Sequence, residues 1–324
     1  MKAAIYTSYG GPDVVRITDV EKPVPKDNEV LMRVRAASVN PLDWRLMKGE
    51  PRLLRLFFGL RKPRLGRPGV DAAGEVEAVG KNVTQFKPRD EVFGACRGAF
   101  AEYACSGESK VAMKPDDVTF EQAASVNVAG LTALQGLRDK GKIQPGSKIL
   151  INGAAGGVGT FAVQIAKSFG AEVTGVCSTR NIDMVRSIGA DEVIDYTRHD
   201  FTTSNQRYDL ILDCVGNHPF SECRRVLTAK GRFIMIGAPH DMTVMGLLAP
   251  MIGALWSSLF GNRKAVPFIS KPSQEDLILL GGLIVTGKLE PIIDRRYNLS
   301  EVSDAMRYVE EGHARGKVLI NLET

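Results

Sequence analysis

Three glycines at every third position, Gly153, Gly156 and Gly159, have the spacing in this chain that most directly indicates chemistry. An apolar run, 149–151, precedes them, and apolar residues with helical spacing follow over 158–169. A strand, a glycine turn and a helix in this order bring bare backbone and the positive end of a helix dipole to one place, where a pyrophosphate can bind. The spacing is GxxGxxG and not the stricter GxGxxG, so the motif by itself also fits an ordinary tight turn.

The pattern that follows the turn supports a nucleotide site. Strands are predicted over 172–177, 192–195, 208–213 and 232–237, with a helix near 181–187. Strands and helices that alternate in this way predict a parallel, doubly wound sheet. A dinucleotide binds such a sheet beyond the carboxyl ends of its strands, where the glycine turn lies. We therefore predict that this stretch binds a nucleotide.

The chain on both sides of the alternating region has a different pattern. Residues 1–121 contain short runs of alternating apolar and polar residues, such as 30–36, and frequent prolines, which predicts an irregular antiparallel barrel. The tail predicts a helix over 273–288, a strand over 291–299, a helix from Ser300 and a strand over 317–321. Because the intervening sheet is already complete, we expect the tail to return to the barrel. The predicted domain segments are 1–121, 122–272 and 273–324.

The composition of the 324 residues argues against several classes of protein. Hydrophobic residues make up 44% of the chain, enough for full cores, and the basic residues behind the net charge of +5 are dispersed, so no nucleic-acid partner is expected. The five cysteines form no CxxC pair, which predicts reduced thiols and a cytoplasmic location, and the N-terminus lacks a signal-peptide layout. Pro250 and glycines interrupt the uncharged run 242–262, so we interpret it as a buried helix at a pocket wall or subunit contact and not as a membrane span.

With these residues in view, the chain resembles the medium-chain dehydrogenase/reductase superfamily, and within it the zinc-free, zeta-crystallin-like quinone oxidoreductases. The resemblance covers nearly the whole chain and rests on the segments 38–43, 68–71 with 74–80, 130–133, 153–159 and 312–317. It implies an α/β protein in which a GroES-like β-barrel substrate domain is interrupted by a Rossmann cofactor domain with a doubly wound parallel sheet. It also implies a homodimer, for which the apolar run 266–269 is a candidate edge strand.

The zinc ligands of the metal-dependent relatives are missing from this sequence. The first ligand position carries Asn40, and the expected His-Glu pair reads Val70-Asp71. Asp71, Cys96 and Cys105 do not make a convincing site, because zinc needs three such ligands and an open position; we interpret them as a turn acid and two buried thiols. We expect no metal. Reduction of a conjugated acceptor is then favoured over alcohol oxidation, because an alkoxide needs a Lewis acid.

The end of the second strand indicates which nicotinamide cofactor binds. An acid there normally holds the adenosine ribose 2′-OH, but this chain reads Cys177-Ser178-Thr179-Arg180. Hydroxyls and a guanidinium suit a 2′-phosphate, so NADPH is predicted over NADH, although Arg180 also fits a solvated helix start. The resemblance implies further cofactor-binding residues: Gly153, Ala155, Gly156, Gly157 and Val158 in the turn; Tyr196 beside the adenine or phosphate; Thr132, Val215, Ile236, Gly237 and Ala238 at the nicotinamide; His313, Ala314, Arg315 and Lys317 in a C-terminal loop; and Asn40 at the nicotinamide ribose.

Two residues are candidates for catalysis. Asn40 is expected near the acceptor carbonyl, where its amide can donate a hydrogen bond to developing negative charge. Asp43 either orients Asn40 or only closes the Pro41 turn. No histidine is well placed to donate a proton, so solvent is the expected source. The predicted function is an NADPH-dependent reductase of a small hydrophobic quinone or enone. The alternatives are an alcohol dehydrogenase or carbonyl reductase of the same superfamily, and a non-catalytic NADPH-binding sensor.

One segment, 52–67, mixes large apolar residues with cations. It fits a helix that covers a pocket and has a solvated basic edge. It also fits a peripheral membrane contact that admits a lipid-like substrate, because basic amphipathic segments bind anionic membranes.

Overall fold

The protein is described from a computed structural model, which covers residues 1–51, 55–64, 66–237 and 263–322, without the side chains of residues 57 and 58. The described chain belongs to two compact units. The first unit comprises Met1–Leu131, Pro272–Gly287 and Pro291–Thr324, and the second comprises Thr132–Lys271 and Lys288–Glu290. The division into domains after residues 121 and 272 stays a prediction. Ala238, one of the expected nicotinamide contacts, and the uncharged run 242–262 lie outside the described residues.

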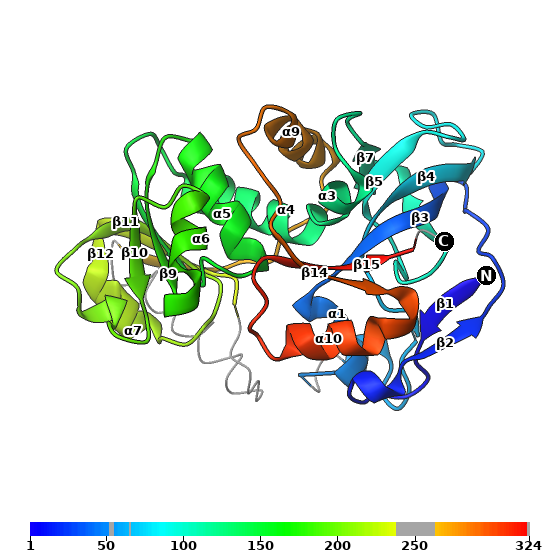
Figure 1. Ribbon diagram of the computed structural model, residues 1–324, viewed down its shortest axis with the longest axis horizontal. Helices are drawn as coiled ribbons and strands as arrows, with labels where there is room; N and C mark the ends of the chain where they lie inside the picture. The colour runs from blue at the N-terminus through cyan, green and yellow to red at the C-terminus, as the bar shows by residue number, and fades with distance from the viewer. Residues whose placement is uncertain (52–54, 65, 238–262, 323–324) are drawn as a thin grey trace. The chain divides into compact units, whose positions relative to one another are not determined.

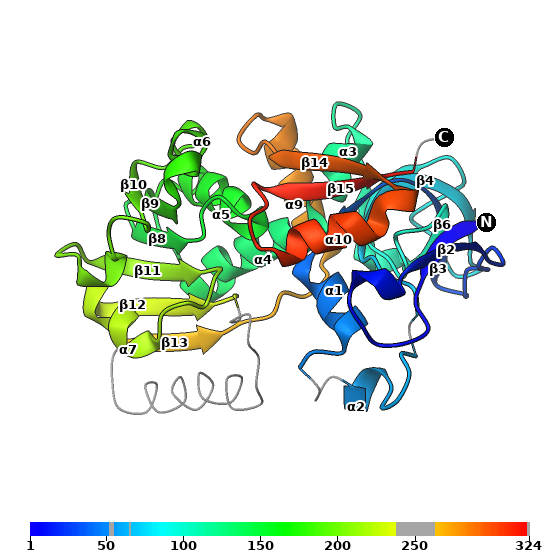
Figure 2. The same cartoon turned by 60° about the horizontal axis from the view of Figure 1, so that its bottom comes forward.

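A parallel sheet forms the centre of the second unit (Figures 1 and 2). Among the described residues its strand order is β10-β9-β8-β11-β12-β13, and all neighbours are parallel. The strands are β8 (Lys148–Asn152), β9 (Glu172–Cys177), β10 (Glu192–Asp195), β11 (Tyr208–Asp213), β12 (Leu227–Met235) and β13 (Lys264–Pro267). Counted along the chain this order is 3-2-1-4-5-6, that of a doubly wound dinucleotide-binding sheet. The predicted fold class is therefore confirmed for this part of the chain.

Both faces of this sheet are covered, as its continuous apolar strands require. Leu150, Ile211 and Phe233 belong to one buried cluster. Leu210 and Leu212 point to the other face, where they contact the π-helical turn η4 (Gly136–Gly141). This turn directly follows the helix α4 (Asn127–Gln135). The helices α5 (Gly157–Ser168) and α6 (Ile182–Ser187) pack on β8, β9 and β10. Shorter helical pieces are η5 (Thr179–Asn181), η6 (Phe201–Thr203), α7 (Phe220–Cys223) and η7 (Arg224–Val226).

The first unit contains a mainly antiparallel sheet. Within the described chain its order is β14-β15-β3-β4-β5-β7, with β6 also paired to β3, and β1 pairs with β2 separately. The strands are β1 (Lys2–Ile5), β2 (Arg16–Asp19), β3 (Glu29–Val39), β4 (Asp71–Val79), β5 (Glu91–Ala95), β6 (Tyr103–Gly107), β7 (Val111–Met113), β14 (Ile293–Asn298) and β15 (Lys317–Asn321). β15 lies between β3 and β14, so the end of the chain belongs to the sheet built by its beginning.

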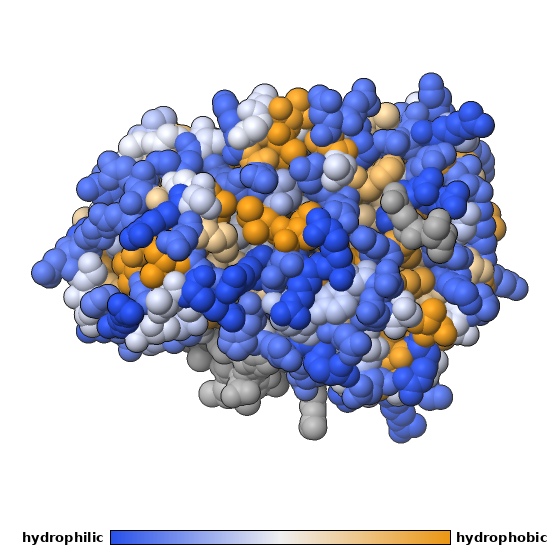
Figure 3. All heavy atoms as spheres, in the orientation of Figure 1, coloured by the Kyte–Doolittle hydropathy of each residue, from blue (hydrophilic) through white to orange (hydrophobic). Residues whose placement is uncertain are grey.

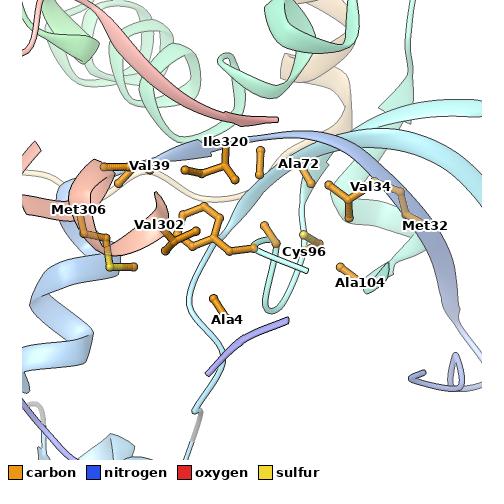
Figure 4. Close-up of a cluster of buried hydrophobic side chains, with 14 of the residues drawn as sticks. Ala4, Met32, Val34, Val39, Ala72, Cys96, Ala104, Val302, Met306 and Ile320 are labelled. Carbon is orange, nitrogen blue, oxygen red and sulfur yellow. The ribbon is translucent and has the colours of Figure 1, made fainter. Parts of the chain in front are cut away.

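The core of the first unit lies against β3, β15 and α10 (Val302–Glu310), as Figure 4 shows. Met32, Val34 and Val39 of β3 pack there with Ile320 and with Met306. Met32 and Val34 share a face because they lie two positions apart, and the register irregularity after Val34 brings Val39 to the same core. The other helices of this unit among the described residues are η1 (Pro12–Val14), α1 (Pro41–Lys48), α2 (Arg55–Phe58), η3 (Glu108–Lys110), α3 (Phe120–Ala124), α9 (Gln274–Val285) and η8 (Leu299–Glu301).

The helix α9 has an apolar outer side. Leu277 and Leu280 are fully buried, whereas Ile278, Leu279 and Val285 are 60%, 44% and 48% exposed. Apolar residues gather on the surface over α9 in Figure 3. None of the helices in the described part of the chain combines the length and apolar character that a membrane span requires.

Candidate cofactor site and polar cluster

The turn between β8 and α5 shows what each glycine contributes. Gly153 has a φ of +84°, in the left-handed region that favours glycine. A Cβ on Gly159 would lie 2.1 Å from the carbonyl oxygen of Gly153, so only glycine allows α5 to approach the turn this closely. A Cβ on Gly156 would lie 3.5 Å from the same oxygen, an ordinary contact. Packing within the protein therefore explains Gly159, whereas Gly156 leaves space that a bound diphosphate can use.

The N-terminus of α5 has the polarity that a diphosphate requires. Gly156 is its N-cap residue, with an extended backbone (φ −83°, ψ 178°), and in the described part of the chain no side chain caps the helix. The backbone N–H groups of the first turn of a helix have no partner within the helix and carry partial positive charge. Gly157 and Val158 are the first two residues of α5, and Ala155 immediately precedes the N-cap residue. These groups fit the diphosphate of a dinucleotide.

A buried acid organises the neighbouring turn at the carboxyl end of β11. Asp213 accepts hydrogen bonds from the N–H groups of Val215 (3.1 Å) and Gly216 (2.9 Å) and from the side-chain amide of Asn152 (2.9 Å). Burial raises the pKa of Asp213. Neither Asp213 nor Asn152 was predicted. The sequence contained only a weak indication of them, because Asn152 and Asp213 are single polar residues at the ends of apolar strands.

The predicted nicotinamide contacts Val215, Ile236 and Gly237 come together at this edge. The N–H groups of Ile236 and Gly237 both donate to the carbonyl oxygen of Asp213 at 2.9 Å. A Cβ on Gly237 would lie 2.4 Å from the backbone nitrogen of Val215. A Cβ on Gly153 would lie 2.7 Å from the side chain of Val215. The hydroxyl of Thr132 lies 2.9 Å from that of Ser270, which follows β13.

The residues predicted to bind the 2′-phosphate follow β9. Ser178 is half-buried, and Thr179 and Arg180 are exposed. Tyr196 is 57% exposed, and its N–H donates to the carbonyl oxygen of Cys177 at 3.1 Å. The sequence reasoning missed Asp195, whose carboxylate accepts a 2.5 Å hydrogen bond from the Thr179 hydroxyl.

A buried polar cluster, defined here as Ser38, Asn40, Asp43, Asp71, Asn127 and Lys317, lies in the first unit. Asn40 is central to it. Its side-chain oxygen accepts from the Lys317 ammonium at 2.6 Å, and its amide nitrogen donates to Asp71 at 3.0 Å and to the carbonyl oxygen of Ser38 at 3.3 Å. The amide is therefore fixed with its oxygen towards a cation and its nitrogen towards an anion.

Asp71 is the residue of this cluster that sequence reasoning misjudged. It is not a turn acid: it is the first residue of β4 and has no exposed surface. Besides Asn40, the side chains of Ser38 (3.0 Å) and Asn127 (2.8 Å) donate to it, and the Lys317 ammonium lies 3.6 Å away. The side-chain oxygen of Asn127 is buried without a partner among the described residues. A buried carboxylate needs this number of donors because its desolvation is costly.

Asp43 contacts the backbone of two residues and not the side-chain amide of Asn40. Its carboxylate accepts from the N–H of Asn40 at 2.8 Å and from that of Gly69 at 3.1 Å. It therefore caps the first turn of α1 and also holds the backbone of Asn40. Burial raises the pKa of Asp43 to about 7, and the nearby Asp71 carboxylate acts in the same direction. Burial also lowers the pKa of the Lys317 ammonium.

The C-terminal loop residues His313, Ala314 and Arg315 precede β15. The N–H of Arg315 donates to Asp294 at 2.9 Å, and the Tyr308 hydroxyl donates to the same oxygen at 2.7 Å. Lys317 differs from its loop neighbours, because its side chain is buried in the polar cluster with Asn40.

We expect Asp43 to make the protein less stable as the pH rises from about 4 to about 7. Its folded-state pKa lies above that of an unfolded aspartate, so the native state holds the proton more tightly, and this contribution is lost as the pH rises through the folded value. The slope is at most about 1.4 kcal/mol per pH unit. Urea unfolding of wild type and Asp43→Asn across this range measures it. Equal slopes for the two proteins would contradict the assignment; a constant offset from the altered helix cap would not.

The polar cluster does not fit a zinc ion. The ammonium of Lys317 lies beside Asp71, and the amide groups of Asn40 and Asn127 point their hydrogens at the same carboxylate. Donors in these positions would repel a cation. Among the residues that the structure describes, no three His, Cys, Asp or Glu side chains come together as a metal site. Cys96 and Cys105 are buried thiols, as interpreted from the sequence, and burial raises the pKa of both.

Comparisons with known proteins agree with this architecture. A family model described as an alcohol dehydrogenase GroES-like domain matches residues 26–116, and one described as a zinc-binding dehydrogenase matches residues 188–320. The chain is 35% identical to the chloroplast envelope quinone oxidoreductase homolog of Arabidopsis thaliana, over 99% of this chain and 98% of that protein. It is 32% identical to the chloroplastic NADPH-dependent alkenal/one oxidoreductase of the same plant, over 99% of this chain and 79% of that protein.

A solved structure shows the same likeness. The quinone oxidoreductase from Coxiella burnetii matches with a TM-score of 0.88 at 30% identity, over 100% of this chain and 99% of that one. Identity at this level over the full length of both chains reflects common descent as well as a common fold. The chain therefore belongs to the medium-chain dehydrogenase/reductase family, in its quinone oxidoreductase-like branch.

Proposed function

We propose that this protein is an NADPH-dependent reductase that delivers a hydride to a small hydrophobic quinone or α,β-unsaturated carbonyl compound, without zinc. The observation that carries the proposal is the β8–α5 turn, where Gly156 leaves open space and the helix N-terminus, which no described side chain caps, offers backbone N–H groups to a diphosphate. The names of the similar plant proteins, a quinone oxidoreductase homolog and an NADPH-dependent alkenal/one oxidoreductase, support the class of acceptor and the cofactor.

The cofactor supplies the hydride, and the chain supplies binding and orientation. The turn binds the diphosphate. Ser178, Arg180 and Tyr196 receive the 2′-phosphate, with Arg180 contributing a charge that NADH would leave unused. Thr132, Val215, Ile236 and Gly237 are proposed beside the nicotinamide, and the loop residues His313, Ala314 and Arg315 also remain proposed contacts of the cofactor.

Asn40 is the proposed donor towards charge that develops on the acceptor oxygen. Its amide is held by Asp71 and Lys317, so little reorganisation is needed when a substrate oxygen accepts from it. The bond from this amide to the carbonyl oxygen of Ser38 is its longest, at 3.3 Å, and that hydrogen is the one a substrate oxygen can share. Lys317 and Asp43 act through Asn40, by fixing its side chain and its backbone.

Steady-state oxidation of NADPH tests the function directly. We expect turnover with 9,10-phenanthrenequinone, with a medium-chain enone, or with both, and product formation that matches the loss of NADPH. Tight binding of NADPH without turnover on a broad panel of acceptors would favour a non-catalytic NADPH-binding protein. Alcohol oxidation together with bound zinc by elemental analysis would favour an alcohol dehydrogenase.

Assembly and location are also proposals. β13 is the last strand in the described sheet order, and Ile269 beyond it is 89% exposed, which supports a homodimer through this edge. A monomeric mass in light scattering would refute the homodimer.

A peripheral membrane contact is supported by Leu56 and Leu60, which are 56% and 71% exposed and lie near basic residues in the sequence. Failure of the protein to sediment with anionic vesicles would refute this contact. The scattered thiols support a cytoplasmic location, whereas the two plant relatives are named as chloroplast proteins.

A further inference from the structure

Asp195 places an acidic side chain beside the proposed 2′-phosphate site. The strand that leads directly to this site, β9, does not itself end in an acid. β9 and β10 are parallel neighbours, and Asp195 at the end of β10 pairs with Cys177 at the end of β9. The hydroxyl of Thr179, two residues beyond β9, donates a hydrogen bond of 2.5 Å to Asp195 at the end of β10. At the end of the second strand an acid normally favours the 2′-OH of NADH and repels the phosphate of NADPH. Asp195 ends the neighbouring third strand and brings the same charge within hydrogen-bonding distance of Thr179.

The carboxylate of Asp195 is covered by donors on both oxygens. One oxygen receives the Thr179 hydroxyl, and the Nε of Arg198 lies 3.7 Å from it. The other oxygen receives the N–H of Thr197 at 3.0 Å and its hydroxyl at 2.8 Å. These donors lower the pKa of Asp195, the Thr179 hydroxyl most of all. The acid is therefore ionised, and its charge is met by neighbours within the protein.

The hydroxyl groups of Thr179 and Ser178 differ in whether their hydrogen is already used within the protein. Thr179 has a single hydroxyl hydrogen, and it is used by Asp195. Ser178 instead accepts a hydrogen bond from the side chain of Asn181 at 3.2 Å, which leaves its own hydrogen for an outside acceptor. Thr179 therefore cannot donate to a phosphate while it covers Asp195, whereas Ser178 can.

We propose that Thr179 is a specificity-determining residue that acts as a screen: its hydroxyl covers Asp195 and so makes this edge of the sheet acceptable to a 2′-phosphate. Ser178 and Arg180 provide the attraction, and the Thr179–Asp195 pair removes the repulsion that would otherwise select NADH. The proposal refines the cofactor preference in the proposed function and rests on it.

A double-mutant cycle on the full-length, cofactor-free protein tests the screen. Dissociation constants for NADPH and for NADH are measured by calorimetry for wild type, Thr179→Val, Asp195→Asn and the double variant. Thr179→Val exposes the carboxylate, so we expect NADPH to bind about tenfold more weakly, while NADH changes by less than about threefold. In the double variant the charge is gone, and we expect the NADPH affinity to return to within about threefold of wild type.

Thr179→Ser is the matched control, because it keeps the hydroxyl and should keep the wild-type ratio of the two constants. If Thr179→Val unfolds, the comparison of Thr179→Ser with Thr179→Ala replaces it. An unchanged ratio in the variant that lacks the hydroxyl would overturn the screen, as would an equal weakening of both cofactors or a double variant no better than Thr179→Val. Because the readout is binding, a wild type that shows these ratios but reduces neither quinone nor enone would refute the reaction and leave the screen standing.

Discussion

Gly156→Ala is expected to fold like the wild type and to lose at least about tenfold in NADPH affinity, because a methyl group takes the space beside the diphosphate. The folded protein tolerates the change: the backbone of Gly156 is extended, and the new Cβ makes only an ordinary 3.5 Å contact. Fluorescence titration with NADPH measures the loss, and urea unfolding of the cofactor-free protein measures the stability.

Gly159→Ala is the matched variant, three residues further along the same turn. Its Cβ would lie 2.1 Å from the carbonyl oxygen of Gly153, so α5 must move away from β8. We expect a lower free energy of unfolding, by about 1–3 kcal/mol, even without cofactor. The contrast separates the two glycines: one is needed by the ligand and the other by the fold. Wild-type affinity in Gly156→Ala would show that the diphosphate does not bind at this turn.

Lys317→Met is expected to lower the free energy of unfolding by about 3–5 kcal/mol, because it leaves a buried carboxylate without its cation. Lys317 is 3% exposed and Asp71 is not exposed at all, so water cannot replace the ammonium without a change of structure. The side-chain oxygen of Asn40 also loses its 2.6 Å donor, so the value of kcat should fall together with stability. Urea unfolding and steady-state kinetics measure the two effects.

A double variant identifies the cause of this loss. Asp71→Asn combined with Lys317→Met should recover part of the stability lost in the single variant, because the charge is removed with its partner. No recovery in the double variant would mean that lost packing and not charge explains the effect.

Much of the fold could be predicted from local patterns. The strand over 317–321 and the strands over 172–177, 192–195 and 208–213 have the predicted bounds, and α5 begins and ends within one residue of its predicted range. Apolar periodicity and turn residues depend only on neighbours in the sequence, so they can be read without the tertiary structure. Gly170 and Gly189 follow the ends of α5 and α6, and their φ values of +77° and +109° lie in the left-handed region that favours glycine.

The candidate site was predictable only in part. The glycine turn lies within one segment, and its spacing carried the inference. Asp71 was misjudged because its donors come from Ser38, 33 positions away, from Asn127, 56 away, and from the distant Lys317. Asp195 was missed for the same reason, since it meets Thr179 only through the pairing of β9 with β10.

By itself, the sequence determined the α/β alternation, the position of the glycine turn and the absence of an acid at the end of β9, because each depends on residues that are neighbours along the chain. Only the tertiary structure decided that Lys317 lies in a buried cluster with Asn40, and that an acid from the adjacent strand reaches Thr179. The physical reason is strand register: it places side chains from distant segments within hydrogen-bonding distance, and burial then requires each charge among them to find a partner.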